Sequence, residues 1–551
     1  GNIKIISGSE AEKKSIEESK VQLCGKLEAR MRDLNLEFDS NGNRAKVYLY
    51  CQEAICPETG WSIPLSPSWV ISSTKKVFAK LIPNQIEKKF DIEIVSGASK
   101  EELKDALKGT VQDGMMTYSL EGKVYSTPIK TLRGDIRGNR HSSTNSLRQW
   151  TKEDFMPMEG DIFTERLYAI QWITKESLNK NRFETFFSTV SNEDLEREKE
   201  VNLIVGRQIS EWQEKGLIPD MAIEPGDKTD EPIRTRGWTH WHHLFNARQL
   251  LKFALTKEFI NESKHSAELT VFLARSLDTS SKLTRWDSAN GQDRVANTFS
   301  NQALNPLFNY ACRASAHLIP QLNYQVSDTI KSGFAGNFEI HSREASSIDI
   351  EADMYITDPP YADAVNYHEI TEYFIAWLRK NPPKPFDEWT WDSRRALAIK
   401  GSGDDFRKGM VNAYKTMADQ MPDNGMQCVM FTHQDTSVWS DMIGIFWAAG
   451  LQVVGAWYIA TETSTELKKG GYVQGTVILM LRKRPTGEKS GFRHRLLPAV
   501  RAEVKHQIET MMHLNDEIKD KMGEPVFNDS DLQMAGYAAS LKVLTAYTHI
   551  G

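Results

Sequence analysis

The chain has 551 residues and a formal net charge of −6 at pH 7, with 40% hydrophobic and 26% charged residues. These values are normal for a globular protein of about three or four domains, and they exclude a disordered or low-complexity chain. No apolar run is long enough to span a bilayer and no signal peptide opens the chain, so we expect no membrane contact. The acidic balance argues weakly against nucleic acid as a partner, so any DNA binding should depend on local basic patches.

The start of the chain and its cysteines bear on its cellular location. The sequence begins with Gly1 rather than Met, which suggests a processed or truncated terminus. Its five cysteines are unevenly spaced over a long sequence and do not form a disulfide framework. A reducing, cytoplasmic location fits them best.

The N-terminal part is expected to form three segments. Residues 1–45 are charged and helix-like, 46–150 are β-rich with Gly, Pro and Ser between short runs, and 151–325 are mainly helical. The predicted strands of the second segment are Lys46–Cys51, Trp69–Ile82, Phe90–Val95 and Lys123–Ile129. Helical periodicity dominates the third segment, apart from a loop rich in Pro and Gly at 219–237.

Residues 326–484 alternate between strand and helix, which is typical of a mixed α/β sheet. Short strands are expected at Met354–Thr357 and Gln427–Thr432. Amphipathic helices are expected over 366–379 and 404–421, where apolar residues recur on one face.

Two further strands and a helical tail complete the predicted elements. Leu451–Thr461 and Val473–Arg482 are expected to pair antiparallel. Residues 485–551 form a helical segment whose last helix should begin near Asn528 or Asp529 as N-cap. The fold class predicted from these elements is α/β.

The tetrapeptide Asp358-Pro359-Pro360-Tyr361 is the strongest chemical signal in the chain. A nucleobase amino nitrogen is a poor nucleophile because its lone pair is delocalised into the ring. A carboxylate at 358 and the Pro359 carbonyl can each accept one of its N–H groups, and proline leaves that carbonyl free because it has a fixed φ and no N–H. Tyr361 offers an aromatic face for a base flipped out of the duplex.

The same tetrapeptide is also good chemistry for a tight turn after a strand. Its position between an apolar strand and an amphipathic helix favours the functional interpretation. An Asp in the first place, as at Asp358, is typical of enzymes that methylate adenine N6, whereas cytosine-N4 enzymes more often have Ser there.

Several motifs together give the chain a family resemblance. It resembles large prokaryotic adenine-specific DNA methylases that contain a zinc ribbon and often lie beside phage-defence genes. The matching segments are Cys51–Leu65, Asn192–Glu200, Gly216–Pro219, Leu244–Leu251, Phe299–Leu304, Thr357–Tyr361, Tyr373–Arg379 and Phe431–His433. The resemblance implies a Rossmann-like methyltransferase sheet with a β-rich, ribbon-like insert and additional helical regions. It also implies S-adenosyl-L-methionine as methyl donor, DNA as substrate, and a role in restriction-modification or phage defence.

Methylases of this class hold the methionine end of the cofactor on a Phe-x-Gly-x-Gly loop, which the family places upstream of the ribbon. The best local substitute, Phe334–Phe338, lacks the second Gly and does not follow an apolar strand. We therefore expect a removed N-terminal segment or a second protein chain to supply the loop.

One cofactor contact is implied closer to the tetrapeptide. The family usually has a Gly-Asp-Ala-like stretch before the catalytic strand, and Arg343-Glu344-Ala345 takes its place here. Glu344 would then meet the adenine amino group of the cofactor, with Ala345 beside it and Asp358 on the sulfonium side. A solvated surface Glu is the alternative for Glu344.

The ribbon that the resemblance implies has lost most of its ligands. Cys51 and Cys56 have a knuckle-like spacing, but a structural zinc needs four ligands and no second Cys pair follows Thr110. We expect a ribbon-shaped β unit without metal. His240, His242 and His243 are expected to serve helix-start packing or DNA contact rather than a metal.

Two stretches combine arginines with aromatic residues, as phosphate contact and base stacking require. The first contains Arg133, Arg137 and Arg140, and the second contains Arg234 and Arg236. For each stretch a solvated loop is an equally good interpretation.

The sequence thus predicts a site-specific adenine-N6 DNA methyltransferase with Asp358, Pro359, Pro360 and Tyr361 as its catalytic residues. The alternatives are a catalytically silent DNA-binding or scaffold subunit of a defence complex, and a cytosine-N4 or RNA methyltransferase.

Overall fold

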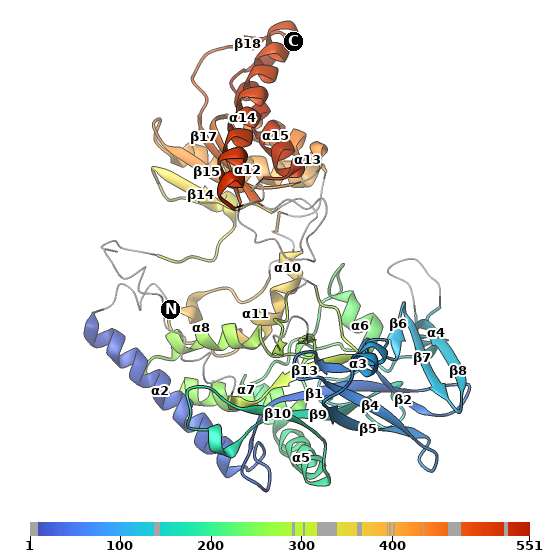
Figure 1. Cartoon of the computed structure of the whole chain (residues 1–551). Coiled ribbons are helices and arrows are strands. Elements are labelled where there is room, and N and C mark those ends of the chain that lie inside the picture. Colours follow the sequence, from blue (N-terminus) through green and yellow to red (C-terminus); the bar gives the residue numbers. More distant parts are fainter. Residues whose placement is uncertain are drawn as a thin grey trace. The chain divides into compact units, whose positions relative to one another are not determined.

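The computed structural model describes residues 9–136, 144–288, 293–300, 303–316, 339–360, 366–393, 395, 398–399, 403–433, 435–460, 475–522 and 527–551. The chain folds into two compact units. Unit 1 comprises Gly1–Ile340 and His368–Ser393, and unit 2 comprises His341–Tyr367 and Arg394–Gly551 (Figure 1).

This division differs from the segments expected from the sequence. Residues 1–45, 46–150 and 151–325 share unit 1, whereas 326–484 are divided between the two units. The piece 368–393 belongs to unit 1 because its aromatic residues pack on a helix there.

Unit 1 is built on an eight-stranded sheet with the order β10-β9-β1-β2-β5-β4-β3, and β13 also pairs with β1. Its strands are β1 Arg44–Ile55, β2 Ser62–Leu65, β3 Val70–Ser72, β4 Val77–Asn84, β5 Lys89–Ser96, β9 Phe163–Ile173, β10 Thr185–Thr189 and β13 Asn309–Arg313. β1 pairs antiparallel with β9 along one edge and with β13 and β2 along the other. Tyr50 and Tyr310 face each other across β1 and β13 with stacked rings 5.2 Å apart.

The region predicted to be mainly helical, 151–325, contains strands β9, β10 and β13 and two-residue strands at 286–287 and 294–295, so that prediction is wrong for these elements. The run from Leu167 to Ile173 is buried at every position. Strands covered on both faces lose the alternation of apolar and polar residues, and a continuous apolar run does not distinguish strand from helix.

Two smaller sheets complete the strands of unit 1. The first contains β6 Val111–Gln112, β7 Met115–Leu120 and β8 Lys123–Pro128, and the second contains β11 Trp286–Asp287 and β12 Arg294–Val295. The predicted strand at Lys123–Ile129 corresponds to β8, and α4 begins at its last residue.

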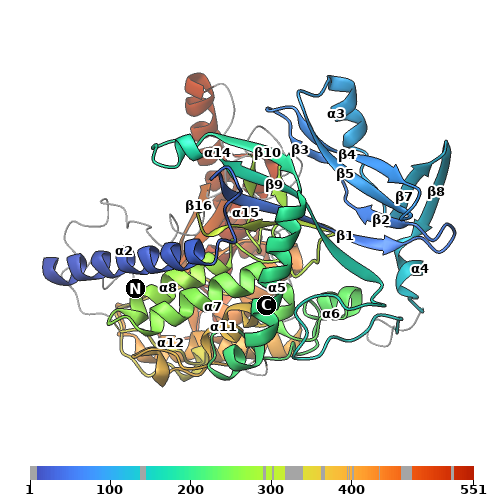
Figure 2. The same cartoon turned by 90° about the horizontal axis from the view of Figure 1, so that it is seen from below.

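The helices of unit 1 are α2 Glu10–Asp33, α3 Lys100–Ala106, α4 Ile129–Arg133, α5 Asn192–Glu214, α6 Asp230–Arg236, α7 Ala247–Asn261, α8 Ser266–Leu277 and α11 Glu372–Leu378, with 3-10 turns η1 Lys175–Ser177, η2 Trp241–Leu244 and η6 Phe386–Glu388. α10 Tyr367–Ile370 spans the boundary between the units. α7 is buried along most of its length and packs against α2, α5 and α8 (Figure 2). Trp377 of α11 packs its ring against Phe245 and Phe253, which holds 368–393 in unit 1.

Unit 2 contains a four-stranded sheet with the order β14-β15-β17-β16. Its strands are β14 Met354–Thr357, β15 Met426–Phe431, β16 Leu451–Ala460 and β17 Gly475–Lys483. β14 and β15 are parallel, whereas β17 runs antiparallel to both β15 and β16, as predicted for the last two strands. The other elements are α12 Asp404–Gln420, α13 Thr436–Ala448, α14 Arg493–Met522, α15 Asp529–Leu544, the turn η5 Ala345–Ser347 and the short pair β18 Ser490–Gly491 and β19 His549–Ile550.

Local signals in unit 2 predicted these elements well. The apolar face expected of the helix at 404–421 is buried: Phe406, Met410, Ala413 and Met417 lie in α12, and Met421 follows it directly. Asn528 caps α15 by accepting a hydrogen bond from the Asp531 N–H, in a capping box that confirms the predicted N-cap.

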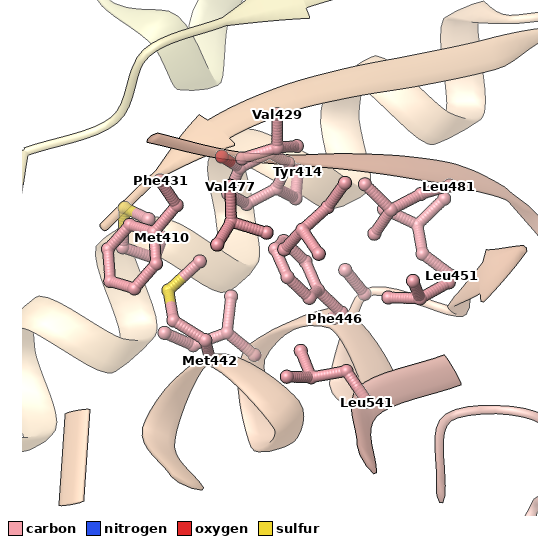
Figure 3. Packing of buried hydrophobic residues seen from close by; sticks show 14 of the residues in the cluster. Met410, Tyr414, Val429, Phe431, Met442, Phe446, Leu451, Val477, Leu481 and Leu541 are labelled. Carbon is pink, nitrogen blue, oxygen red and sulfur yellow. The ribbon is translucent and has the colours of Figure 1, made fainter. Parts of the chain in front are cut away.

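The core of unit 2 lies on one face of the sheet. Val429, Val477 and Leu481 point from the strands towards Met442, Phe446 and Leu541 on the helices (Figure 3). The alternate strand residues form what we call the outer face: Ile356, Cys428, Met430, Trp457, Ile478 and Met480. This face is apolar, and the described part of unit 2 leaves it half-exposed or exposed.

Candidate functional site

Asp358, Pro359 and Pro360 follow β14 directly, at the end where the parallel strands β14 and β15 both finish. The Asp358 side chain is exposed, Pro359 is buried and Pro360 is half-buried. The carboxyl ends of parallel strands are the usual place for ligands in α/β sheets. Tyr361 lies outside the described residues, so its predicted stacking role stays a prediction.

The strand end is held by a buried tyrosine that the sequence had not singled out. Tyr414 of α12 has its hydroxyl 3.3 Å from Thr357 Oγ1. Burial raises the pKa of Tyr414, and the nearby charge of Asp358 contributes in the same direction. Tyr414 therefore stays neutral and can form a hydrogen bond with the side chain of Thr357, next to Asp358.

The segment before β14 carries the predicted cofactor residues. Glu344 and Ala345 are both exposed, and the Glu344 carboxylate accepts a hydrogen bond of 2.6 Å from Ser346 Oγ. The carbonyl of Ser346 accepts a bond of 3.2 Å from Thr416 Oγ1 on α12. The same helix therefore anchors the segment that carries Glu344 and the strand that leads to Asp358.

The end of β15 adds two polar side chains. Thr432 and His433 follow the strand, and the buried hydroxyl of Thr432 makes no hydrogen bond within the part of the chain that the structure describes. His433 Nδ1 accepts a bond of 3.0 Å from the Asp435 N–H, and its carbonyl accepts one of 2.7 Å from Trp439 Nε1. Both residues belong to the segment Phe431–His433 that contributes to the family resemblance, and β15 is parallel to β14, which Asp358 follows.

The ribbon-like cysteines lie in separate environments. Cys51 is fully buried in β1 and packs with Val47 and Leu49, whereas Cys56 packs with Trp61 and Ile63 in another apolar cluster. Among the described residues, no group of three or more His, Cys, Asp or Glu is placed to hold a metal ion.

The first predicted DNA stretch is only partly described. Arg133 is buried and donates hydrogen bonds to Asp135 through Nε and Nη2, with the Nη2 to Oδ2 distance at 2.6 Å. Arg137 and Arg140 lie outside the described residues. In this conformation Arg133 serves an internal ion pair rather than a phosphate.

The second stretch is also used internally. Arg236 is buried and donates to the carbonyls of Thr235, Pro306 and Leu307. Burial lowers the pKa of this guanidinium to about 9. Arg234 is partly exposed and forms an ion pair with Glu231. A buried guanidinium cannot reach DNA, so the structure does not support phosphate contact by Arg236.

The histidine cluster serves packing, the first of its two predicted roles. His242 and His243 are fully buried, and their Nε2 atoms lie 3.0 Å from the Asp154 carbonyl and 2.9 Å from the Thr151 carbonyl, respectively. Burial lowers the pKa of His242 to about 3 and holds the pKa of His243 well below its usual value. Both rings are neutral and tie η2 to the preceding loop.

Comparison of the chain with family models, with curated protein sequences and with solved structures finds no match to any of them. Among the described helices, none combines the length and apolar character that crossing a bilayer would require.

Proposed function

We propose that the chain is an S-adenosyl-L-methionine-dependent DNA methyltransferase that acts on adenine N6. The observation that carries this proposal is the exposed carboxylate of Asp358 at the shared carboxyl end of β14 and β15, followed by two prolines. An exposed carboxylate at the end of a strand is held in place by the sheet and can be reached by an amino group, as alignment of that group requires.

Asp358 accepts one N–H of the flipped adenine, and the Pro359 carbonyl accepts the other. Their combined pull makes the nitrogen more tetrahedral and directs its lone pair towards the methyl group. Tyr361 stacks on the base and offsets part of the cost of unstacking, a few kcal/mol. Tyr414 acts through Thr357 and is a positioning residue.

The described residues fit part of the methyl donor. S-adenosyl-L-methionine, when bound, supplies a methyl group on a cationic sulfur. Glu344 has an exposed carboxylate that would meet its adenine amino group, and Asp358 would lie on the sulfonium side. The segments that carry these two residues are anchored on α12 through Ser346 and Thr357, which supports a shared site. The loop that would hold the methionine end is proposed to come from another segment or from a partner chain.

The outer face of unit 2 supports this requirement for another segment. Ile356 is 65% exposed and Trp457 is 55% exposed, although both sit in strands of a sheet whose other face is fully packed. Strands in α/β sheets with parallel pairs are normally covered on both faces. Helices that cover this face would complete a Rossmann-like sheet in unit 2. The same segment or partner chain that supplies the cofactor loop would supply these helices.

The test is methyl transfer by the complete system, with the complex isolated from its native host if a partner is required. Radiolabelled methyl groups should enter DNA, and nucleoside analysis should find N6-methyladenine. Asp358→Ala should lower the rate by about 10²–10³-fold or more, because one transition-state acceptor is lost. Asp353→Ala, a change of the same kind before β14, is the control and should retain activity.

Other products would assign the chain differently. N4-methylcytosine or methylated RNA would replace adenine-N6 chemistry with one of the alternative activities. If the complex binds DNA and the methyl donor but transfers no methyl group, the chain is a catalytically silent scaffold subunit.

A further inference from the structure

Unit 1 contains an open cavity of about 690 Å³ that none of the predicted site residues lines. It lies where the end of α8 meets β11, β12 and β13. Four arginines line it: Arg275, Arg285, Arg294 and Arg313. We propose that this cavity binds consecutive phosphates of a DNA strand, an inference that rests on the proposed function for the identity of its ligand.

The described lining of the cavity holds more cationic than anionic side chains, although the chain is acidic overall. The carboxylates in this described lining are Asp278 and Asp287, beside the four guanidiniums. Asp287 lies 3.7 Å from Arg285 and 3.8 Å from Arg294, distances at the outer limit of an ion pair. Both separations exceed hydrogen-bond distance and both arginine side chains are at least half exposed, so a phosphate oxygen can reach either guanidinium.

The second carboxylate in the lining, Asp278, stabilises a loop. Asp278 Oδ1 accepts a hydrogen bond of 3.3 Å from the Phe299 N–H, and its carbonyl accepts one of 2.6 Å from the Thr298 N–H. Burial raises the pKa of Asp278, and the nearby Arg313 opposes that rise. Asp278 therefore fixes the loop after β12 and neutralises the basic lining only in part.

The arginines stand at different depths. The side chains of Arg285 and Arg294 are 50% and 62% exposed, and Arg275 is also exposed. Arg313 is buried on β13 and donates a bond of 2.6 Å to the Val295 carbonyl, which fixes its guanidinium. A fixed cation at the base with exposed cations at the rim suits a chain of phosphates better than one small anion, because guanidiniums at different depths can each pair with a separate phosphate.

The cavity wall is connected to α11, the second helix after Asp-Pro-Pro-Tyr in the chain. Phe299 packs edge-on against Tyr373 of α11, with ring centroids 5.2 Å apart. The Tyr373 hydroxyl donates a bond of 2.8 Å to the carbonyl of Leu277, the last residue of α8 before Asp278. Phe299 also begins the Phe299–Leu304 motif, for which the proposed chemistry supplies no other role.

The experiment measures the binding of fluorescent duplex and single-stranded oligonucleotides to the full chain at several salt concentrations, without methyl donor. The test variant combines Arg275→Gln, Arg285→Gln and Arg294→Gln. The matched control removes the same charge from exposed positions elsewhere in unit 1: Arg30→Gln, Arg182→Gln and Arg207→Gln.

The test variant should bind at least about tenfold more weakly near 0.1 M salt, on every sequence. Its salt slope should fall by about one for each arginine that faces a phosphate. The control should match the unmodified chain. Equal losses in test and control variants would overturn the proposal, since they would reflect net charge alone.

Calorimetry with a nucleoside triphosphate distinguishes a free nucleotide from a DNA strand as the source of the phosphates. Arginine-dependent triphosphate binding without oligonucleotide binding would assign the cavity to a free nucleotide and overturn its assignment to DNA. Arginine-dependent oligonucleotide binding in a complex that transfers no methyl group would support the cavity and remove only the proposed activity. If the test variant keeps both normal methyl transfer and normal DNA binding, the cavity assignment is overturned and the proposed activity is supported.

Discussion

The hydroxyl of Tyr414 lies 3.3 Å from Thr357 Oγ1, so a fully buried ring on α12 holds the last residue of the strand before Asp358. The contact links the position of the proposed catalytic carboxylate to the packing of unit 2. A single hydroxyl can therefore be tested for a positioning role that is separate from folding.

We expect Tyr414→Phe to keep the fold and to lower the rate of methyl transfer by about tenfold. One neutral hydrogen bond contributes about 1 kcal/mol to stability, and the ring that fills the core is retained. A misplaced acceptor should lower kcat more than it raises KM. Steady-state kinetics and thermal melts check this, and an unchanged kcat would leave Tyr414 a purely structural residue.

Ile478→Glu on the outer face of unit 2 should leave the isolated chain folded and prevent it from joining its partner or covering segment. Val477→Glu is the matched change on the packed face and should unfold unit 2, because it buries an unpaired charge. Circular dichroism and co-purification from the native host separate these effects. Normal assembly of the Ile478→Glu chain would contradict a docking role for this face.

The chain alone should bind S-adenosyl-L-methionine only weakly, with a Kd above about 0.1 mM. Glu344 and Asp358 would contact two parts of the ligand, but backbone N–H groups of a Gly-rich loop approach the methionine end more closely than residues with a Cβ allow. Calorimetry on the isolated chain measures this. Micromolar affinity would show that Phe334–Phe338, which lies outside the described residues, or another local segment supplies the loop.

The purified chain should contain no stoichiometric zinc. Cys51 and Cys56 pack in different apolar clusters, and burial raises the pKa of the Cys51 thiol, which disfavours the thiolate that zinc requires. Elemental analysis of the unmodified chain checks the prediction. One zinc per chain that disappears in Cys51→Ser would refute it.

Acid should destabilise unit 1 through its buried histidines. Burial holds the pKa of His242 at about 3, below its ordinary value of 6.5, so the unfolded chain binds the proton first. The contribution of His242 to the free energy of unfolding is complete above about pH 6.5. It is lost as the pH falls from there towards 3, at about 1.4 kcal/mol per pH unit. The pKa of His243 is shifted in the same direction.

Urea titrations at pH 7.5 and 5.5 measure this loss. The fall in unfolding free energy between the two pH values should be smaller in His242→Gln than in the unmodified chain. His513→Gln, at an exposed position, should leave the fall unchanged. An equal fall in all three proteins would assign the acid sensitivity to other groups.

The sequence by itself determined the local elements around Asp358. The strand at Met354–Thr357, the inward face of α12 and the cap at Asn528 follow from periodicity and capping, which depend on residues a few positions apart. The antiparallel pairing of β16 and β17 was also predicted, since nearby apolar runs separated by a turn tend to pair.

Only the tertiary structure decided the features that depend on distant partners. β9 became a strand because β1 offers a long edge for pairing, a contact between residues more than a hundred positions apart, and β10 in turn pairs with β9. Arg133 and Arg236 were predicted to contact DNA, but both are buried. Arg133 donates hydrogen bonds to a carboxylate, and Arg236 donates to backbone carbonyls. Arg275 and Arg313 are far apart in sequence and line one cavity only after folding. Local patterns predict local structure, whereas burial and clustering depend on which surfaces meet.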